Sequence, residues 1–394
     1  NMPAFPRRSK GPSEPTGSRR PAWRRWLAVA LLGAALPLAA AAQGQAAPSL
    51  PSVSTIPPST QPTPTQPVKG GFTAAAGHGA EAAPLRFGIL PLGGAFESRS
   101  DWDPLLAELS RALGRPVAVL SVNSYEALEQ AIQRDDVDMA FLSGKMALDA
   151  VSQRRMKVVA QVVRHDGLPG YRALLLARKA PPFNTLAGLL ADPDRWRLAR
   201  GEKQSVSGFI VPQLQFFLPH HIAMETRFAS EVVGTHQVTA LAVANNEADV
   251  ATNNTADFER FRLRFPAEAG RLQVLWESEL IPHAQIVMRR DYPSELRQRV
   301  QAFLVAYGRA KGPRGDAERV VLKSLHDLAG FVPADNSSLL PAARLAYQLA
   351  TQNAKTAQWV NDAARQARLQ RLDSGYAEQV GVLKDVSPCL LYTS

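Results

Sequence analysis

The 394-residue chain is poor in the residues on which small secreted scaffolds and many metalloproteins depend. It has a single cysteine, Cys389, so no disulfide can form within it. It also lacks a Cys-x-x-Cys pair, a His-Glu-x-x-His sequence and a Walker-type phosphate loop, which excludes a zinc ribbon, a zincin and a P-loop NTPase. A chain of this length with 45% hydrophobic residues can instead be held by its own core.

Long apolar runs without charge are also scarce, and the clearest one lies near the start. It extends from Trp26 to Ala42, follows a group of arginines and passes into small residues up to Ala47. This order predicts a cleaved signal peptide within residues 1–47 and export to the periplasm, by either the Sec or the twin-arginine route. An uncleaved anchor is the alternative, although the run is short and rich in alanine for a membrane span.

The net charge of +10 does not indicate nucleic-acid binding, because most of it lies in this leader. The first 47 residues hold seven basic residues and one acid, a net +6, which leaves only +4 for the remainder. Residues 48–84 are dominated by Pro, Ser, Thr, Gln, Gly and Ala and are predicted to be a linker. Residues 389–394 correspond to the translation of a transposon-library adapter, and we expect them to be a sequencing artefact.

From Leu85 onward the hydrophobic pattern alternates between strands and helices. Short apolar runs at 85–90, 116–122 and 137–142 are separated by helical patterns, which predicts a parallel sheet covered on both faces. Further strands are expected at 158–163, 173–177, 232–233, 250–251 and 272–276, with helices at 208–218 and 239–245. Helices then dominate at 293–308, 318–328 and 341–372, and we expect these last segments to pack on a first lobe.

One segment combines several groups suited to an anion. Ser205, Val206, Ser207 and Gly208 stand at the predicted start of an apolar helix, where backbone N–H groups have no acceptor within the helix. Two hydroxyls and the positive end of the helix would add to these donors and favour a phosphate-like oxyanion. An ordinary serine N-cap is the simpler interpretation of the same pattern.

Three further residues carry side chains that could donate to the same anion. His236 lies between a short predicted strand and a helix, Tyr125 begins a helix directly after a strand, and Tyr171 follows a Pro-Gly pair. A surface histidine and two packed tyrosines are the alternatives.

Taken together, these segments resemble the phosphate, phosphite and phosphonate periplasmic binding proteins of ABC transporters. The resemblance is carried by short segments whose order and spacing match the family: Asn123–Ala127, Asp136–Phe141, Gly170-Tyr171, Ser205–Gly208, Gly234–His236, Ala242–Asn245, Asp249–Thr255, Trp276–Pro282, and Phe331 with Asp335–Ser337. It implies an α/β, two-lobed type II periplasmic binding fold with parallel-rich sheets and two crossover strands. The expected lobes are residues 85–174 with 284–388, and residues 175–283.

The resemblance also implies the ligand-binding residues, the partner and the mode of action. Ser205, Val206, Ser207 and Gly208, with His236, Tyr125 and Tyr171, would hold the oxyanion; Val206 replaces a hydroxyl residue of the family pattern but keeps its amide. We expect a monomer that delivers the anion to an ABC permease in the inner membrane, with no enzymatic activity, cofactor, metal site or nucleic-acid partner. A sensor domain of a two-component system is the main alternative, and an enzyme on the same fold is a third.

A second departure from the family pattern bears on the ligand. Receptors for aminoethylphosphonate place two carboxylates near the ammonium group, and the corresponding positions here fall on Ala256 and Ala284. Asp257 is adjacent to the first of them, but a neighbouring residue usually points elsewhere. An ammonium buried without a carboxylate would be destabilised, so weak aminoethylphosphonate binding is expected. The neighbouring arginines Arg260, Arg262 and Arg264 are expected to form a solvated helix face.

Overall fold

The computed structural model describes residues 83–93, 95–182, 185–325 and 327–384. The expected signal peptide, nearly all of the expected linker and residues 389–394 lie outside these ranges. Within them, no helix is long and apolar enough to cross a bilayer.

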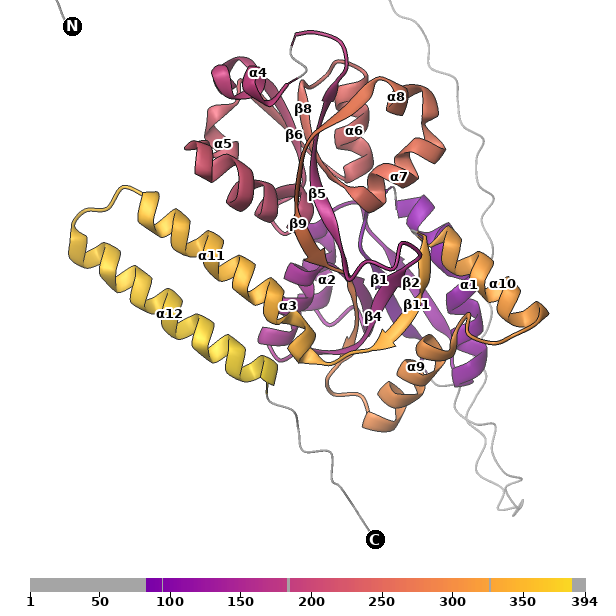
Figure 1. The fold of residues 1–394 in the computed structure, drawn as a ribbon. Coiled ribbons are helices and arrows are strands. Elements are labelled where there is room, and N and C mark those ends of the chain that lie inside the picture. Colours follow the sequence, from indigo (N-terminus) through magenta and orange to yellow (C-terminus); the bar gives the residue numbers. More distant parts are fainter. Residues whose placement is uncertain (1–82, 94, 183–184, 326, 385–394) are drawn as a thin grey trace, which may run out of the picture. The chain divides into compact units, whose positions relative to one another are not determined.

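The first lobe is built on a six-stranded mixed sheet with the strand order β11-β4-β10-β3-β1-β2 (Figure 1). β1 pairs in parallel with β2 and β3, whereas β10 runs antiparallel to β3 and β4, and β11 antiparallel to β4. The strands are β1 (Leu85–Ile89), β2 (Val117–Ser121), β3 (Met139–Leu142), β4 (Met156–Arg164), β10 (Gln285–Arg289) and β11 (Leu328–Pro333). The helices of this lobe are α1 (Ala95–Leu113), α2 (Tyr125–Gln133), α3 (Gly144–Ser152), α9 (Ser294–Ala306) and α10 (Pro313–Ser324).

The second lobe contains a five-stranded sheet with the order β7-β6-β8-β5-β9. β6 is parallel to β7 and β8, and β5 is antiparallel to β8 and β9. The strands are β5 (Gly170–Arg178), β6 (Arg197–Arg200), β7 (Ser230–Val233), β8 (Val250–Asn254) and β9 (Leu272–Pro282). The helices are α4 (Leu186–Ala191), α5 (Met224–Arg227), α6 (His236–Ala244), α7 (Thr255–Arg264) and α8 (Pro266–Gly270), with short 3-10 and π segments η1 (Pro193–Arg195), η2 (Val206–Ile210), η3 (Gln213–Phe217) and η4 (Leu218–His220).

Two connections join the lobes, and this confirms the two-lobed α/β prediction. The chain passes to the second sheet between β4 and β5 and returns between β9 and β10. β5 and β9 pair along their length from Gly170 opposite Pro282 to Arg178 opposite Leu272, and Figure 1 shows them running from one lobe toward the other. The carboxyl ends of β1, β3 and β4 therefore face the second lobe.

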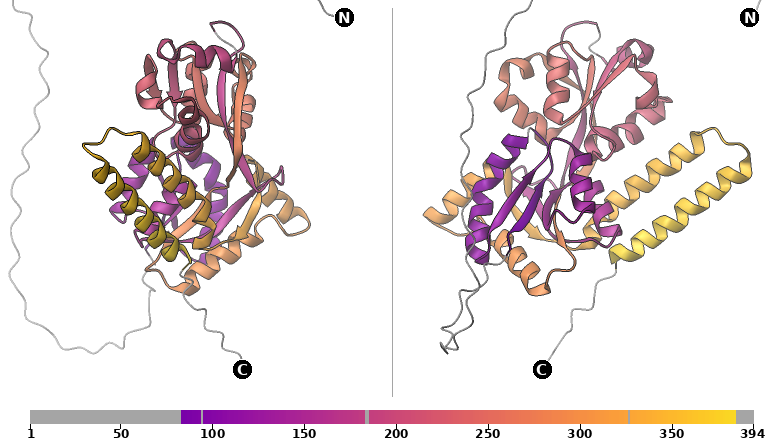
Figure 2. Two further views of the ribbon diagram at one scale, coloured as in Figure 1. Left: turned by 60° about the vertical axis from the view of Figure 1, so that its left-hand side comes forward. Right: turned by 180° about the vertical axis from the view of Figure 1, so that it is seen from behind.

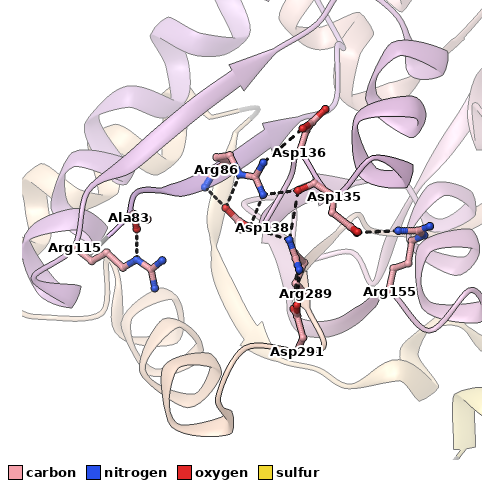
Figure 3. Close-up of polar contacts among 9 residues, drawn as sticks. All are labelled: Ala83, Arg86, Arg115, Asp135, Asp136, Asp138, Arg155, Arg289 and Asp291. Carbon is pink, nitrogen blue, oxygen red and sulfur yellow. Dashed lines mark hydrogen bonds and ion pairs between the residues drawn. The ribbon is translucent and has the colours of Figure 1, made fainter. Parts of the chain in front are cut away.

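An arginine–aspartate pair links two parallel strands at their amino ends in each sheet, at the end of the sheet that faces away from the other lobe. In the first lobe, Asp138 accepts hydrogen bonds from the backbone amide, Nε and Nη2 of Arg86 at 2.8–2.9 Å (Figure 3). In the second lobe, Asp249 accepts the same three bonds from Arg197 at 2.9–3.0 Å. Burial alone would raise the pKa of each aspartate, but the arginine hydrogen bonds outweigh it and lower both pKa values. The two lobes thus share the same arginine–aspartate arrangement at corresponding ends of their sheets.

The C-terminal helices differ from their expected form in two places. The expected helix at 318–328 ends at Ser324, and Leu328 begins β11, where Gly330 adopts φ +147°, a backbone conformation that favours glycine. The expected helix at 341–372 is two helices, α11 (Leu340–Thr356) and α12 (Asp362–Lys384), after the 3-10 turn η5 (Asn336–Leu339). Trp359 explains the break, because its indole N–H donates to the Ala354 carbonyl at 2.6 Å and satisfies the end of α11.

α11 and α12 lie antiparallel and side by side (Figure 2). The Tyr347 and Tyr376 rings stack between them with centroids 4.5 Å apart. Contrary to expectation, α11 packs on both lobes, because Leu349 joins the apolar cluster of the second lobe around Phe216 and Phe217.

Trp102 is the largest fully buried side chain of the first lobe. Its ring lies 5.2 Å from Phe87 and 5.0 Å from Phe141, between α1 and the sheet. Truncation to alanine leaves a cavity that the surrounding strands cannot fill, so Trp102→Ala is expected to lower the free energy of unfolding by about 3–5 kcal/mol. Chemical denaturation would measure this loss. Phe96→Ala on the same helix is the control, since Phe96 is 84% exposed; an equal loss in both variants would contradict the argument.

Candidate ligand-binding site

A glycine-supported turn starts the helical run that contains η2. An added Cβ on Gly208 would lie 2.8 Å from Gly201 Cα and 2.7 Å from Ser205 Oγ, so only glycine permits this approach. Thr252 Oγ1 fixes the turn by donating to the Gly208 carbonyl at 2.7 Å. Ser205 caps the run, with its Oγ accepting the Gly208 N–H at 3.0 Å. The serine N-cap interpretation is therefore correct for Ser205.

The start of η2 nevertheless retains free donors. In the part of the chain that the structure describes, the amides of Val206 and Ser207 have no hydrogen-bond acceptor. Both residues are buried and line a cavity, whereas Gly208 is not among the lining residues. The amide donors expected from the sequence are thus present at Val206 and Ser207, and the Gly208 amide is used within the turn.

His236 lies directly beside this turn. It is the first residue of α6, which Thr235 caps, and it is only 4% exposed. Its Nε2 lies 3.0 Å from Ser207 Oγ, which also accepts a hydrogen bond from Asn254 Nδ2 at 3.1 Å. The alternative of a surface histidine is excluded by this burial.

Two tyrosines complete the group. Tyr125 begins α2 in the first lobe, Tyr171 lies on β5, and both line the cavity with Ser205, Ser207 and His236. Burial raises the pKa of both phenols, and hydrogen bonds from Ser205 to Tyr125 and from Ser207 to Tyr171 offset only part of this effect. Both hydroxyl groups therefore keep their protons at neutral pH and can act as donors.

The cavity lies between the lobes and is small. The centre of a water-sized sphere can move within a volume of about 60 Å³. This volume holds about four to six groups of the size of a water molecule. The first lobe contributes Phe141, Ser143 and Arg164 in addition to Tyr125; the second contributes Asn254, Ala256 and Asp257 in addition to the turn. A compact oxyanion with a short substituent fits this space.

Several residues that line the cavity were not expected from the sequence, among them Ser143, Arg164 and His283. Ser143 follows β3 and Arg164 ends β4 in the first lobe, whereas His283 follows β9 of the second-lobe sheet. The expectation that Asp257 points away from the ligand is wrong, because Asp257 lines the cavity. Two hydrogen bonds with Asn254 explain this orientation. Asn254 Nδ2 donates to the Asp257 carboxylate at 2.7 Å, and Asn254 Oδ1 accepts the Asp257 amide as the N-cap of α7.

Contacts outside the cavity also link the lobes. The Glu202 carboxylate of the second lobe accepts the amides of Tyr125 and Glu126 at 2.8 and 3.1 Å, at the start of α2. Asp101 on α1 pairs with Arg260 and Arg264 on α7. The expected solvated face is therefore wrong for Arg260, whose side chain is 16% exposed, whereas Arg262 and Arg264 are exposed as expected.

Burial lowers the pKa of His236. The Asp257 charge and the Thr252 carbonyl raise this pKa again, but by less than burial lowers it. The unfolded chain therefore takes up the proton first, and stability falls as the pH drops below 6.5 toward the lowered value in the folded state. His283 acts in the same direction, since burial lowers its pKa too. We expect His236→Gln to show a smaller loss of Tm between pH 7 and pH 5.5 than the wild type. Equal losses, or an NMR titration of His236 centred at or above pH 6.5, would contradict this.

Among the described residues, no cluster of His, Cys, Asp or Glu could hold a metal ion. The cavity itself is lined by hydroxyl, imidazole, amide and guanidinium donors and by one carboxylate, that of Asp257.

Comparison with known proteins agrees with this geometry. Residues 87–339 match the family model described as ABC transporter, phosphonate, periplasmic substrate-binding protein. The chain is 32% identical over 284 residues to the phosphonates-binding periplasmic protein of Escherichia coli (strain K12), which covers 72% of this chain and 82% of that protein.

Solved structures show the same fold. A binding protein component of an ABC phosphonate transporter from Pseudomonas aeruginosa superposes with a TM-score of 0.70 at 30% identity, over 75% of this chain and 96% of that one. A Prochlorococcus marinus (MIT 9301) protein in complex with methylphosphonate gives a TM-score of 0.59 at 17% identity, over 67% and 97% of the two chains, which is a likeness of fold alone. The two-lobed type II fold is thereby confirmed, and the chain belongs to the family of phosphonate periplasmic substrate-binding proteins of ABC transporters.

Proposed function

We propose that this protein captures a small phosphorus oxyanion, a phosphonate, phosphite or phosphate, between its lobes and delivers it to an ABC permease in the inner membrane. The observation that carries the proposal is the convergence of Ser205, Ser207, His236, Tyr125 and Tyr171 on one cavity that both lobes line. It acts as an exported, monomeric protein in the periplasm; the family and the expected signal peptide support the periplasmic location.

The donors match what an oxyanion requires. Removing a charged phosphoryl group from water is unfavourable unless its oxygens receive several hydrogen bonds at once. The free amides of Val206 and Ser207 and the two protonated phenols offer such bonds from both lobes. Each charge-assisted bond contributes about 1.5–3 kcal/mol, so a few of them support micromolar affinity.

The walls favour a ligand without an ammonium group. Ala256 and Ala284 both line the cavity and offer only methyl groups. Asp257 is the one carboxylate among the lining residues, and it already accepts a hydrogen bond from Asn254. Phosphate, phosphite and simple alkylphosphonates are therefore preferred to aminoethylphosphonate.

The Ser207–His236 contact supports binding and not catalysis. A distance of 3.0 Å between a hydroxyl and an imidazole also occurs in nucleophile–base pairs. Such a base is usually oriented by a carboxylate, but no carboxylate hydrogen-bonds His236 Nδ1 among the described residues. The family, which consists of transport proteins, also favours transport over the sensor alternative.

Differential scanning fluorimetry and calorimetry of the purified protein test the proposal. Methylphosphonate, phosphite or phosphate should raise Tm, because a ligand that binds only the folded state stabilises it by mass action. Aminoethylphosphonate should produce a smaller shift at equal concentration. No shift with any phosphorus oxyanion at millimolar concentration would refute the proposal.

A further inference from the structure

One part of the cavity, lined by Ser143, Arg164 and the methyl group of Ala284, is called the polar corner below. β10 is flanked by β3 and β4, so that Gln285 pairs with Leu142 on one side and with Gln161 on the other. Ala284, one residue earlier, therefore stands between Ser143 and the end of β4, and its carbonyl accepts the Val162 amide. Ser143, Ala284 and Arg164 all line the cavity from this edge of the first lobe.

Ser143 offers a hydroxyl group that makes no hydrogen bond within the described protein. It precedes the nine-residue helix α3 as N-cap but makes no capping hydrogen bond. It is 6% exposed, and its Oγ is buried without a hydrogen-bond partner among the described residues. A buried hydroxyl left in this state is uncommon unless a ligand or water completes it. The start of α3 adds the positive end of a helix at the same place.

Arg164 supplies a cation at the other side of the corner. Among the described residues its guanidinium makes no hydrogen bond and no close ion pair, in contrast to Arg86 and Arg197. Burial lowers the pKa of this guanidinium, although Asp257, Asp327 and Asp166 counteract the effect. A partly buried arginine without a direct partner is a group that an anionic ligand would stabilise.

We infer that this corner is a second subsite that binds an anionic substituent, and that the preferred ligands are short phosphonocarboxylates. The phosphonate would occupy the Ser205–Ser207 turn, and the ligand carboxylate would lie over Ala284 between Ser143 and Arg164. The space above Ala284 is open because alanine offers no longer side chain there. This inference rests on the proposed function and specifies the class of ligand for the same cavity.

Calorimetry with three ligands of similar length tests the subsite in the full-length protein. Phosphonoacetate carries the carboxylate, n-propylphosphonate replaces it with an apolar group, and aminoethylphosphonate carries an ammonium. We expect phosphonoacetate to bind about tenfold more tightly than n-propylphosphonate, a difference typical of one added charge-assisted hydrogen bond. Arg164→Met should weaken phosphonoacetate binding about tenfold more than n-propylphosphonate binding and so remove this preference, and Ser143→Ala should reduce the preference in part.

Arg99→Met is the matched control, because Arg99 is 60% exposed on α1 and should leave all three affinities unchanged. Arg164→Gln is a second variant in case Arg164→Met does not fold. Equal affinities for phosphonoacetate and n-propylphosphonate in the wild type would overturn the subsite while leaving the proposed function intact. Tighter binding of aminoethylphosphonate, lost in Asp257→Asn, would overturn it in favour of a cationic substituent. Failure of all three ligands and of methylphosphonate, phosphite and phosphate would instead refute the proposed function.

Discussion

Ser205→Ala combined with Ser207→Ala is expected to weaken methylphosphonate binding by at least about a hundredfold. Each hydroxyl lies at the start of η2 beside the free amides, and Ser207 Oγ also touches His236. Loss of two hydrogen bonds to a charged ligand removes about 3–6 kcal/mol, which corresponds to a factor of about 10²–10⁴. Calorimetry on the folded variant measures the change directly.

The double variant has a predictable side effect that must be separated from binding. Ser205 Oγ accepts the Gly208 amide, so its loss removes a helix cap, which is worth about 1 kcal/mol. The Tm without ligand should therefore fall modestly, while the shift produced by ligand should disappear. Ser230→Ala and His220→Ala, both at exposed positions, should keep the full shift. A double variant that binds within threefold of the wild type would show that the oxyanion lies elsewhere.

The sequence predicted the turn and its partners because their signals are local. A hydroxyl-rich segment before an apolar run, a tyrosine at a helix start and a strand–helix junction at His236 can each be recognised within a few residues. Their meeting in one cavity required the resemblance to a family, since His236 and Ser207 are 29 residues apart and Tyr125 comes from the other lobe.

The strands and site residues that could not be predicted from the sequence depend on tertiary structure. β10 and β11 were not anticipated, because each pairs with β4 from far along the chain. Arg164 and Ser143 acquire their place only when β10 inserts between β3 and β4. Arg260 has the charge pattern of an exposed helix, and only the approach of α1 buries it against Asp101. Helix periodicity reports which face is apolar, not which lobe will cover a charged face.

Glu202→Ala is expected to weaken ligand binding by about tenfold, although Glu202 is not among the residues that line the cavity. Its carboxylate joins the second lobe to the amides of Tyr125 and Glu126, where the positive end of α2 favours a negative charge. Because these bonds join the two lobes, separation of the lobes would break them, so their loss is expected to destabilise a closed form relative to an open one. Because Glu202 is only partly buried, solvent screening reduces the effect below that of two fully buried charge-assisted bonds.

Kinetics separate this role from direct ligand contact. A contact that holds the lobes together should act mainly on dissociation, so stopped-flow measurements are expected to show a faster off-rate with an on-rate close to that of the wild type. Small-angle scattering at saturating ligand should still report the compact form, because excess ligand shifts the equilibrium back toward closure. Glu225→Ala is the matched control, since the ion pair of Glu225 with Lys203 lies entirely within the second lobe. If Glu202→Ala and Glu225→Ala bind ligand equally well, closure of the lobes is driven by the ligand itself and by the pairing of Asp101 with α7.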